Sequence, residues 1–238
     1  MHLVIKILVM EWIHNYQLFL FDFDGILVNT EELHYKAYLK MCADRGFALK
    51  WDQRTYMRYA MYTATGMKEG IYQALPDLQR CEPCWDILYR EKKKIYFALI
   101  QNEGVSLMPG VAQLLVELEK AQIKRCVVTH SPSEQITLIR EQHPILNSIP
   151  HWMTREDYSQ PKPSSECYTK AIAKFKTPGD RVIGFEDSPR GLKALLGTEA
   201  EGVFLTDCFE PSEIQQLSEE IGKKFLYFAS FPCIRLLA

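Results

Sequence analysis

Residues 19–28 read Phe-Leu-Phe-Asp-Phe-Asp-Gly-Ile-Leu-Val, an apolar run that ends in two carboxylates spaced one residue apart. The run predicts a buried strand over Leu18–Phe21, with Asp22 and Asp24 at its carboxyl end. Open α/β sheets bind their ligands at that end of the strands, and Gly25 allows the chain to turn sharply away. Asp and Gly are also common in ordinary turns. The stretch therefore indicates a reaction centre only if partner residues follow further along the chain.

The second half of the chain alternates short apolar runs with helical patterns. Strands are expected at Arg125–Thr129, His151–Met153, Val182–Phe185 and Gly202–Leu205. Helices are expected at Val111–Ala121, Ser133–Glu141, Ser164–Phe175 and Pro189–Leu196. This alternation is typical of parallel βαβ units, whose crossovers are too long for hairpins. We therefore predict an α/β protein with a doubly wound parallel sheet, which the first strand joins.

The segment between the first strand and this second half has helical patterns throughout. Helices are expected at Glu31–Arg45, Asp52–Tyr59, Gly66–Leu75 and Glu82–Ile100. In the last of them, the charged run at residues 90–94 is interpreted as the solvent-facing side, above Leu88, Ile95 and Leu99. We expect an α/β core domain of residues 1–30 and 107–238, and an inserted all-helical cap domain of residues 31–106 over the sheet edge.

Composition excludes several classes of protein. The chain has 238 residues and is 47% hydrophobic, which is enough for a substantial core. Its 28 basic and 30 acidic residues leave a formal net charge of -2, so no general field attracts nucleic acid or an anionic membrane. We expect a monomer that binds a small molecule and has neither a nucleic-acid nor a membrane partner.

Cysteine usage and the first residues bear on location. Seven scattered cysteines suit a reducing compartment and favour the cytoplasm. Cys81 and Cys84 are interpreted as free thiols in preference to a redox or zinc pair, because no second pair completes a zinc site. Residues 1–10 are apolar but meet Glu11 too soon for a membrane span or a signal peptide. They are interpreted as an extension, with Met10 as the start.

Three later signals supply partners for Asp22 and Asp24. Thr129 ends a strand, and Ser131 is expected to cap the next helix with Pro132 at its first position, which makes an anion site. Lys162 lies between two prolines just before a helix, where it supplies a fixed positive charge. A further strand ends in the two acids Glu186 and Asp187. Each junction from strand to helix therefore contributes polar chemistry to the same edge of the sheet.

The chemistry that suits this set is phosphoryl transfer. Asp22 is the expected nucleophile, and it forms an aspartyl phosphate. A carboxylate approaching a phosphate needs a cation, so Mg2+ is expected on Asp22, the backbone carbonyl of Asp24 and Asp187, helped by Glu186. Lys162 and Thr129 are expected to hold the phosphoryl oxygens, and Asp24 to act as general acid and base. Two alternatives stay open: Glu186 supports a ligand instead of being one, and Ser131 is only a helix cap.

The order of these residues resembles that of the haloacid dehalogenase-like hydrolases. The four motifs of that family correspond to Asp22-Phe23-Asp24-Gly25, Thr129, Lys162 and Gly184-Phe185-Glu186-Asp187-Ser188. The resemblance implies the family's Rossmann-like core and an Asp22 nucleophile. In that family a second carboxylate such as Asp24 marks phosphatases and mutases, as opposed to dehalogenases and phosphonatases.

A closer resemblance is to the CbbY-type sugar phosphatases and the β-phosphoglucomutases. It is carried by Asn29-Thr30-Glu31-Glu32-Leu33-His34, Thr65-Gly66-Met67-Lys68-Glu69 and Leu107-Met108-Pro109-Gly110-Val111. It implies that the substrate is lined by Glu31, His34, Tyr56, Gly66 and Lys68. The chain has Met67 where the pattern has a second Gly and Gly70 where it has an Arg, so recognition of a second phosphate is not carried over.

Several of these assignments have an alternative in which the residue has only a structural role. His34 lies on the same helical face as Thr30 and either supports Asp24 or is an ordinary partly buried histidine. Lys68 is either a phosphate anchor or a surface lysine. Selection of the substrate is assigned to distances among Tyr56, Lys68, Arg54 and Arg58.

Three functions are carried forward. The first is a magnesium-dependent phosphatase that acts on a small phosphorylated metabolite, a sugar phosphate, and the second is a β-phosphoglucomutase-like phosphomutase. Pro132 follows Ser131 where mutase relatives have a basic residue, which favours the phosphatase. The third is a non-catalytic module that binds a phosphorylated ligand or a protein, against which the intact acids and Lys162 argue.

Overall fold

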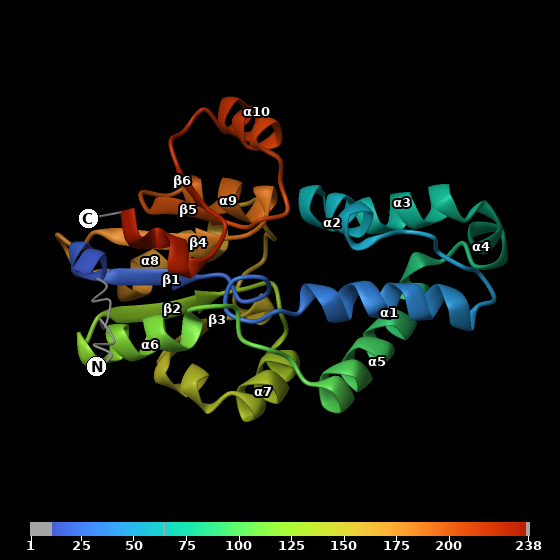
Figure 1. Cartoon of the computed structure of the whole chain (residues 1–238), viewed down its shortest axis with the longest axis horizontal. Helices are drawn as coiled ribbons and strands as arrows, with labels where there is room; N and C mark the ends of the chain where they lie inside the picture. Colours follow the sequence, from blue (N-terminus) through green and yellow to red (C-terminus); the bar gives the residue numbers. More distant parts are fainter. Residues whose placement is uncertain (1–10, 64, 237–238) are drawn as a thin grey trace, which may run out of the picture.

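The computed structural model describes residues 11–63 and 65–236. Its centre is a six-stranded parallel sheet in the order β3-β2-β1-β4-β5-β6 (Figure 1). The strands are β1 (Leu18–Phe21), β2 (Lys124–Val128), β3 (His151–Met153), β4 (Val182–Glu186), β5 (Glu201–Leu205) and β6 (Leu226–Phe228). The predicted α/β class with a parallel sheet is confirmed. β6 was not expected, because three partly exposed edge residues leave too short a pattern to read.

Helices cover both faces of the sheet. They are α6 (Val111–Lys120), α7 (Ser133–Gln142), α8 (Glu166–Phe175), α9 (Pro189–Leu196) and α10 (Pro211–Ile221). Short 3-10 helices occur at Glu11–Asn15, Pro144–Ser148, Arg155–Asp157 and Phe231–Leu236. On one face, Phe19 and Phe21 of β1 pack with α6 and α7. On the other, Leu18 and Leu20 pack with α8 and α9, as strand alternation requires.

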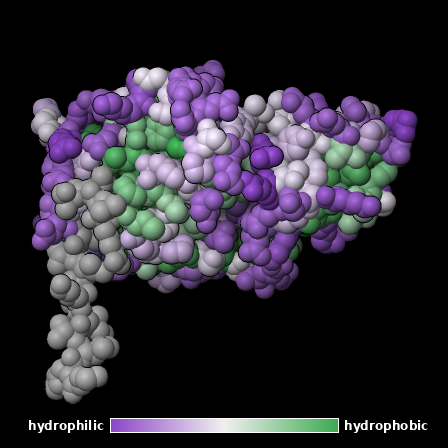
Figure 2. Space-filling model, turned by 45° about the horizontal axis from the view of Figure 1, so that its top comes forward, coloured by the Kyte–Doolittle hydropathy of each residue, from purple (hydrophilic) through white to green (hydrophobic). Residues whose placement is uncertain are grey.

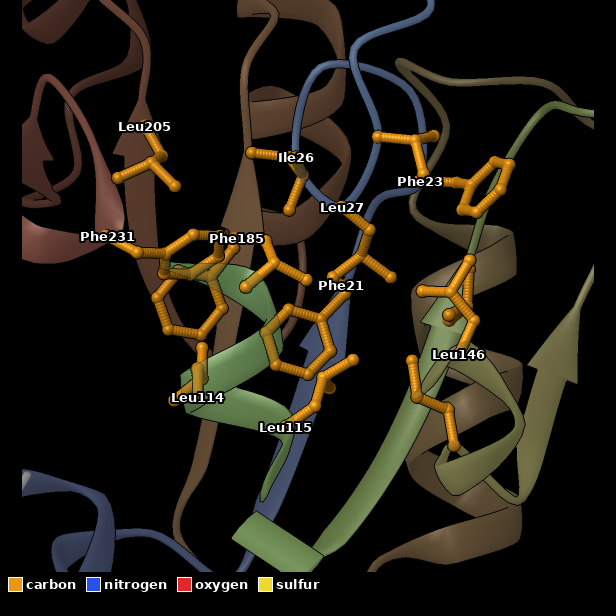
Figure 3. Packing of buried hydrophobic residues seen from close by; sticks show 14 of the residues in the cluster. Phe21, Phe23, Ile26, Leu27, Leu114, Leu115, Leu146, Phe185, Leu205 and Phe231 are labelled. Atoms are coloured by element: carbon orange, nitrogen blue, oxygen red, sulfur yellow. The ribbon is translucent and has the colours of Figure 1, made fainter. Parts of the chain in front are cut away.

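Aromatic stacking anchors β1 beside β4 at the centre of the sheet. Phe21 stacks on Phe185 with ring centroids 5.2 Å apart, and Phe231 lies 5.3 Å from Phe185 (Figure 3). Ile26 and Leu27 of the loop after β1 point into the same core. Each of these fully buried side chains contributes roughly 1.5–3 kcal/mol. The loop that carries the acids is therefore held firmly by its apolar residues.

The helical insert joins the rest of the chain through two adjacent segments. It comprises α1 (Glu31–Asp44), α2 (Gln53–Tyr62), α3 (Gly66–Ala74), α4 (Pro76–Cys81) and α5 (Trp85–Glu103), grouped to one side of the sheet in Figure 1. It has a hydrophobic cluster of its own. The backbone N–H of Asn29 donates to the carbonyl of Ser106 at 2.8 Å, where the chain leaves and returns. The short α4 was not expected from the sequence.

The interpretation of residues 90–94 as solvent-facing is wrong for Lys92, which is only 3% exposed. The buried stripe of α5 is Leu88, Lys92, Tyr96 and Ile100, each four residues after the last. A helix places such residues on one face, so Lys92 belongs to the packed side although its neighbours are charged.

The expectations about the chain ends and the cysteines have simple outcomes. Residues 1–10, interpreted as an extension with Met10 as the start, lie outside the described residues. Cys81 and Cys84 are exposed free thiols. Within the described ranges, no helix has the length and apolar character needed to cross a bilayer. Hydrophilic residues cover much of the face seen in Figure 2.

Candidate active site

A cavity of about 440 Å³ lies at the carboxyl ends of β1, β2 and β4. The residues after these strands line its floor, and α1, α2 and α5 of the insert contribute to its walls. The floor includes Asp22, Asp24, Ser131, Lys162 and Asp187, which the sequence analysis had picked out. Residues separated by up to 165 positions in the chain thus meet, because neighbouring parallel strands end at the same edge.

Lys162 is the central cation of the floor. Its ammonium group donates to Asp22 Oδ1 at 2.9 Å, to Glu186 Oε1 at 2.7 Å and to the carbonyl of Val128 at 2.9 Å. Only 4% of Lys162 is exposed. The charges of both carboxylates raise its pKa against the opposing effect of burial. Lys162 is therefore a fixed positive charge beside Asp22.

Glu186 lies behind the floor and is fully buried. Its Oε1 also accepts a hydrogen bond from Tyr168, and its Oε2 has no partner among the described residues. Burial raises the pKa of Glu186 to about 7, and the ion pair with Lys162 opposes that rise. A side chain at Gly191 would place its Cβ 1.9 Å from Oε2, so a glycine is required there.

Asp187 has no side-chain hydrogen-bond donor among the described residues, although it is only 6% exposed. Burial, followed by the charge of Asp22, raises the pKa of Asp187 well above its usual value. Gly25 has a φ of +74°, and a Cβ there would lie 2.0 Å from Asp187 Oδ2. The turn after β1 therefore needs Gly25 both for its backbone angle and for the close approach of Asp187.

Asp22, Glu186 and Asp187 form an acidic cluster that fits a divalent cation. One carboxylate oxygen from each lies within 4.8 Å of the others, and all three residues are buried. Three buried acids with one lysine are costly unless further positive charge is bound. A set made only of oxygen donors suits Mg2+. The donor set and the unpartnered Glu186 oxygen thus agree with the ion expected from the sequence.

Asp24 points toward a network of donors on the β2 side. Its Oδ1 accepts from Thr30 Oγ1 at 2.6 Å and from Gln135 Nε2 at 3.0 Å, and its Oδ2 accepts from the Ser131 hydroxyl. Burial, followed by the charge of Asp22, raises the pKa of Asp24, while the hydroxyl donors oppose the rise. These contacts hold the carboxyl group in place at the floor of the cavity.

The expected cap at Ser131 is wrong. α7 begins at Ser133, so Pro132 occupies the N-cap position, and no side chain caps the helix. The hydroxyl of Ser131 instead donates to Asp24. The charge-assisted hydrogen bond directs the Ser131 side chain toward Asp24, away from the start of α7.

Thr129 is fully buried and is not among the residues that line the cavity. Its hydroxyl oxygen accepts from the backbone N–H of Ser131 at 2.9 Å. The neighbouring His130 lines the cavity and accepts the backbone N–H of Lys162 at 2.8 Å. Burial lowers the pKa of His130 to about 3, so this ring stays neutral and orders the Lys162 loop.

The insert brings a second group of residues over the floor. His34 stacks on Tyr96 at a centroid distance of 3.9 Å, and its Nδ1 is hydrogen-bonded to the Lys92 ammonium group. Lys92 also lies 4.7 Å from the ring centroids of Tyr38 and Tyr96. Burial lowers the pKa of Lys92 to about 7. Burial and then the charge of Lys92 lower the pKa of His34, so the ring is a neutral partner.

The cavity continues into the insert as a second chamber of about 450 Å³. Glu31, His34, Lys92 and Arg190 line both spaces. The Glu31 carboxylate accepts from the Tyr56 hydroxyl at 2.6 Å, and burial raises the pKa of Glu31. Of the other residues expected to bind substrate, Tyr56 and Lys68 line the second chamber, whereas Gly66 lines neither space.

Three residues expected from the sequence to contact or select the substrate lie outside both spaces of the site: Gly66, Arg54 and Arg58. A Cβ at Gly66 would lie 2.2 Å from the carbonyl oxygen of Tyr59, so this glycine allows α2 and α3 to pack closely. Arg54 and Arg58 pair with Glu210 and Glu213 outside both spaces. Assigning substrate selection to these arginines is not supported by their positions.

Five residues that contact or line the site were not predicted from the sequence: Lys92, His130, Gln135, Tyr168 and Arg190. The four-residue spacing of Leu88, Lys92 and Tyr96 was a readable signal for Lys92. Arg190 follows Pro189 at the start of α9, next to the acids, and its position there was also a signal. Gln135 and Tyr168 depend on contacts between separate elements, for which the sequence carries no local pattern.

Comparison with known proteins finds consistent similarities. The family model described as haloacid dehalogenase-like hydrolase matches residues 19–201. Protein CbbY of Cereibacter sphaeroides is 31% identical over 185 residues, 75% of this chain and 79% of that protein. A phosphorylated carbohydrates phosphatase of Thermotoga maritima is 22% identical over 188 residues, 78% of this chain and 82% of that protein. The solved structure of CbbY from Rhodobacter sphaeroides in complex with xylulose-(1,5)bisphosphate has a TM-score of 0.67 at 23% identity, covering 91% of this chain and 95% of that one.

Proposed function

This chain belongs to the haloacid dehalogenase-like hydrolases, and on that premise we propose that it is a magnesium-dependent phosphatase of a sugar phosphate or a similar small metabolite. The observation that carries the proposal is the meeting of Asp22, Lys162 and Asp187 in one cavity, with Lys162 Nζ at 2.9 Å from the Asp22 carboxylate. Relatives named as phosphatases of phosphorylated carbohydrates and of glycerol 3-phosphate support the substrate class.

In the proposed reaction, Asp22 attacks phosphorus and forms an aspartyl phosphate. Lys162 neutralises charge on the phosphoryl oxygens as they move toward Asp22. Asp24 gives its proton to the leaving alcohol and afterwards takes a proton from the water that hydrolyses the intermediate. The raised pKa of Asp24 suits it to the acid role.

Asp22, Asp187 and the carbonyl of Asp24 would hold Mg2+, with Glu186 behind them. When bound, the ion would offset the repulsion between the Asp22 carboxylate and the phosphate dianion. The role of Glu186 follows from its contacts: one oxygen is engaged by Lys162 and Tyr168, which orients the lysine.

We propose that the insert acts as a cap that selects the leaving group and excludes water. Glu31, His34, Lys92 and Arg190 line the passage between the two spaces. A leaving group bound there contacts these four residues, while Tyr56 and Lys68 bound the far chamber. Water exclusion strengthens the electrostatic interactions within the site.

The proposal is tested by measuring inorganic phosphate released from p-nitrophenyl phosphate and from a panel of sugar phosphates, with Mg2+ and with EDTA. Metal-dependent release from the sugar phosphates is expected. No release from any compound would favour a module that binds without turnover. A phosphomutase needs the same centre, so the products of a hexose 1-phosphate must also be followed by NMR. Accumulation of the hexose 6-phosphate in place of free phosphate would contradict the hydrolase.

Replacing Asp187 by Asn is expected to raise the Mg2+ concentration that gives half-maximal phosphate release by about tenfold or more, because the amide carries no charge. The fold should survive, since Asp187 makes no side-chain hydrogen bond in the described structure. Titrating Mg2+ against phosphate release measures the effect, with the exposed Asp207→Asn as the matched control. An unchanged Mg2+ dependence would remove Asp187 from the metal site.

Replacing Asp24 by Asn is expected to slow phosphate release by about 10²- to 10⁴-fold, since the amide cannot exchange protons. Deprotonation of Asp24 removes the acid, so the wild-type rate should fall on the alkaline side of the pKa of Asp24, which burial raises. The variant should lose that alkaline decline in kcat/KM. Gln135→Leu is a useful companion, because it removes a hydrogen bond that stabilises the charged carboxylate of Asp24 and should therefore move the decline to higher pH. An alkaline decline that persists in Asp24→Asn would assign it to another group.

A further inference from the structure

The outer face of α2 carries three residues at four-residue intervals, Arg54, Arg58 and Tyr62. This spacing directs all three side chains to the same side of the helix. On that side they meet Phe209, the N-cap residue Glu210 and Glu213 in the first turn of α10. We call these six residues the outer contact. It joins the insert to the α/β part without lining either space of the active site.

The outer contact consists of two ion pairs and one aromatic pair. Arg54 Nη2 lies 2.5 Å from Glu210 Oε1, and Arg58 Nη2 lies 3.8 Å from Glu213 Oε1. The rings of Tyr62 and Phe209 meet edge to face, with centroids 5.8 Å apart. Phe209 packs against the hydrophobic clusters of both the insert and the α/β part. The two ion pairs and the aromatic pair therefore all run between the insert and the α/β part.

The acidic half of the outer contact is partly ordered by α10 itself. Glu210 is the N-cap of α10, and its backbone N–H donates to Glu213 Oε2 at 2.8 Å in a capping box. The Glu213 carboxylate is thus oriented by its own helix. Less side-chain freedom therefore remains to be lost by Glu213 when it pairs with Arg58.

We propose that Arg54, Arg58 and Tyr62 are positioning residues that hold the insert closed over the active site by contacting Glu210, Glu213 and Phe209. α2 also carries Met61, which lines both spaces of the site, so the outer contact and the substrate space share one helix. The expectation that closure favours substrate binding rests on the function proposed above. The inference that the outer contact stabilises the closed arrangement is independent of that function.

The size of the effect follows from the type of contact. An exposed ion pair changes an equilibrium constant by roughly 1.4- to 5-fold, and an aromatic pair by roughly 2- to 12-fold. Multiplied together, the three contacts shift the balance between closed and open arrangements by about fourfold or more. Contacts this weak hardly change the free energy of unfolding. They can still decide the balance between the closed and open arrangements when these differ by little free energy.

The first experiment measures the distance between the insert and the α/β part directly. Exposed Cys81 in the insert and Cys233 in the α/β part carry spin labels in a Cys84→Ser/Cys208→Ser background, where the other cysteines are buried. Pulsed electron resonance then gives the distance distribution. Arg54→Gln/Arg58→Gln should broaden it and move it to longer distances. Arg80→Gln is the matched control, because Arg80 pairs with Asp77 inside the insert.

The second experiment uses kinetics and a double-mutant cycle. Arg54→Gln and Glu210→Gln are each expected to raise KM for the best substrate by about 2- to 5-fold, with a smaller change in kcat. The double variant should be no worse than either single variant, because both remove the same contact. Arg54→Lys keeps the positive charge, so its KM should lie closer to that of wild type than to that of Arg54→Gln. In 1 M salt, where the Debye length is about 3 Å, wild type should approach the variants.

Unchanged distances in Arg54→Gln/Arg58→Gln relative to Arg80→Gln would overturn the inference, whatever the kinetics show. Strictly additive effects of Arg54→Gln and Glu210→Gln on KM would also overturn it. If the enzyme releases no phosphate from any compound, the proposed function fails and the distance measurement alone decides the role of the outer contact.

Discussion

Asp22→Asn is expected to lower the kcat of phosphate release by at least about a thousandfold. The amide is a poor nucleophile and cannot form the aspartyl phosphate. Among the described residues, the only other carboxylate that pairs with Lys162 is that of Glu186, which is fully buried behind the cavity floor and so cannot replace Asp22. The isosteric change keeps an oxygen that can still accept from Lys162, so the fold should persist. Phosphate release under saturating Mg2+ gives the rate, and circular dichroism checks the fold.

The exposed Asp44→Asn serves as the control for Asp22→Asn, because it removes an equal charge at the end of α1, outside the cavity. Acid quenching of wild type during turnover should trap phosphate on the protein, and the same treatment of Asp22→Asn should trap none. Turnover of Asp22→Asn within tenfold of wild type would rule out Asp22 as the nucleophile and leave water attack on phosphorus as the simplest mechanism.

Lys162→Met should cost both activity and stability. The change leaves the carboxylates of Asp22 and Glu186 buried without their cation, and breaking a buried pair in this way typically costs about 3–5 kcal/mol. Phosphate release should fall by about 10² or more, because the charge on the phosphoryl oxygens also loses its partner. Urea unfolding measures the stability, with the exposed Lys94→Met on α5 as the matched control.

The stability loss in Lys162→Met should depend on pH in a definite direction. Burial raises the pKa of Glu186 to about 7 in wild type, and removing Lys162 removes the main effect that opposes the rise. In the unfolded chain a Glu titrates near about 4.3. Above that pH, folding of the variant must either bury an unpaired charge or take up a proton, so stability falls as pH rises. Glu186 is protonated in both folded proteins below the wild-type pKa of about 7, so the deficit relative to wild type should be smallest there and grow as pH rises above about 7. A deficit that does not change with pH would mean that lost packing, not charge, is its cause.

Local pattern was sufficient for the floor of the site. Leu18–Phe21 was readable as a buried strand because apolar residues without polar alternation are typical of parallel sheets covered on both faces. Lys162 and Asp187 were readable because each lies at a junction from strand or loop to helix. Parallel strands bring such junctions to one edge, so sequence order alone predicts their proximity.

Local pattern failed where contacts compete. Ser131-Pro132-Ser133-Glu134 has the composition of a capped helix start, but the buried carboxylate of Asp24 takes the Ser131 hydroxyl. Lys92 lies in a run of charged residues, but the register of α5 turns it inward against Tyr38, Tyr96 and His34. In both cases a partner distant in sequence decides the outcome.

The sequence by itself determined the parallel sheet, the helical insert and the identity of the acids and lysine at the floor. It could do so because alternation, helical period and the residues at strand ends are properties of neighbouring positions. Only the tertiary structure decided that Lys92 and Arg190 line the passage between the two spaces, and that Arg54 and Arg58 bind α10 instead of the substrate. Those outcomes depend on how the insert packs against the α/β part, and that packing is a balance among distant side chains which no short stretch of sequence encodes.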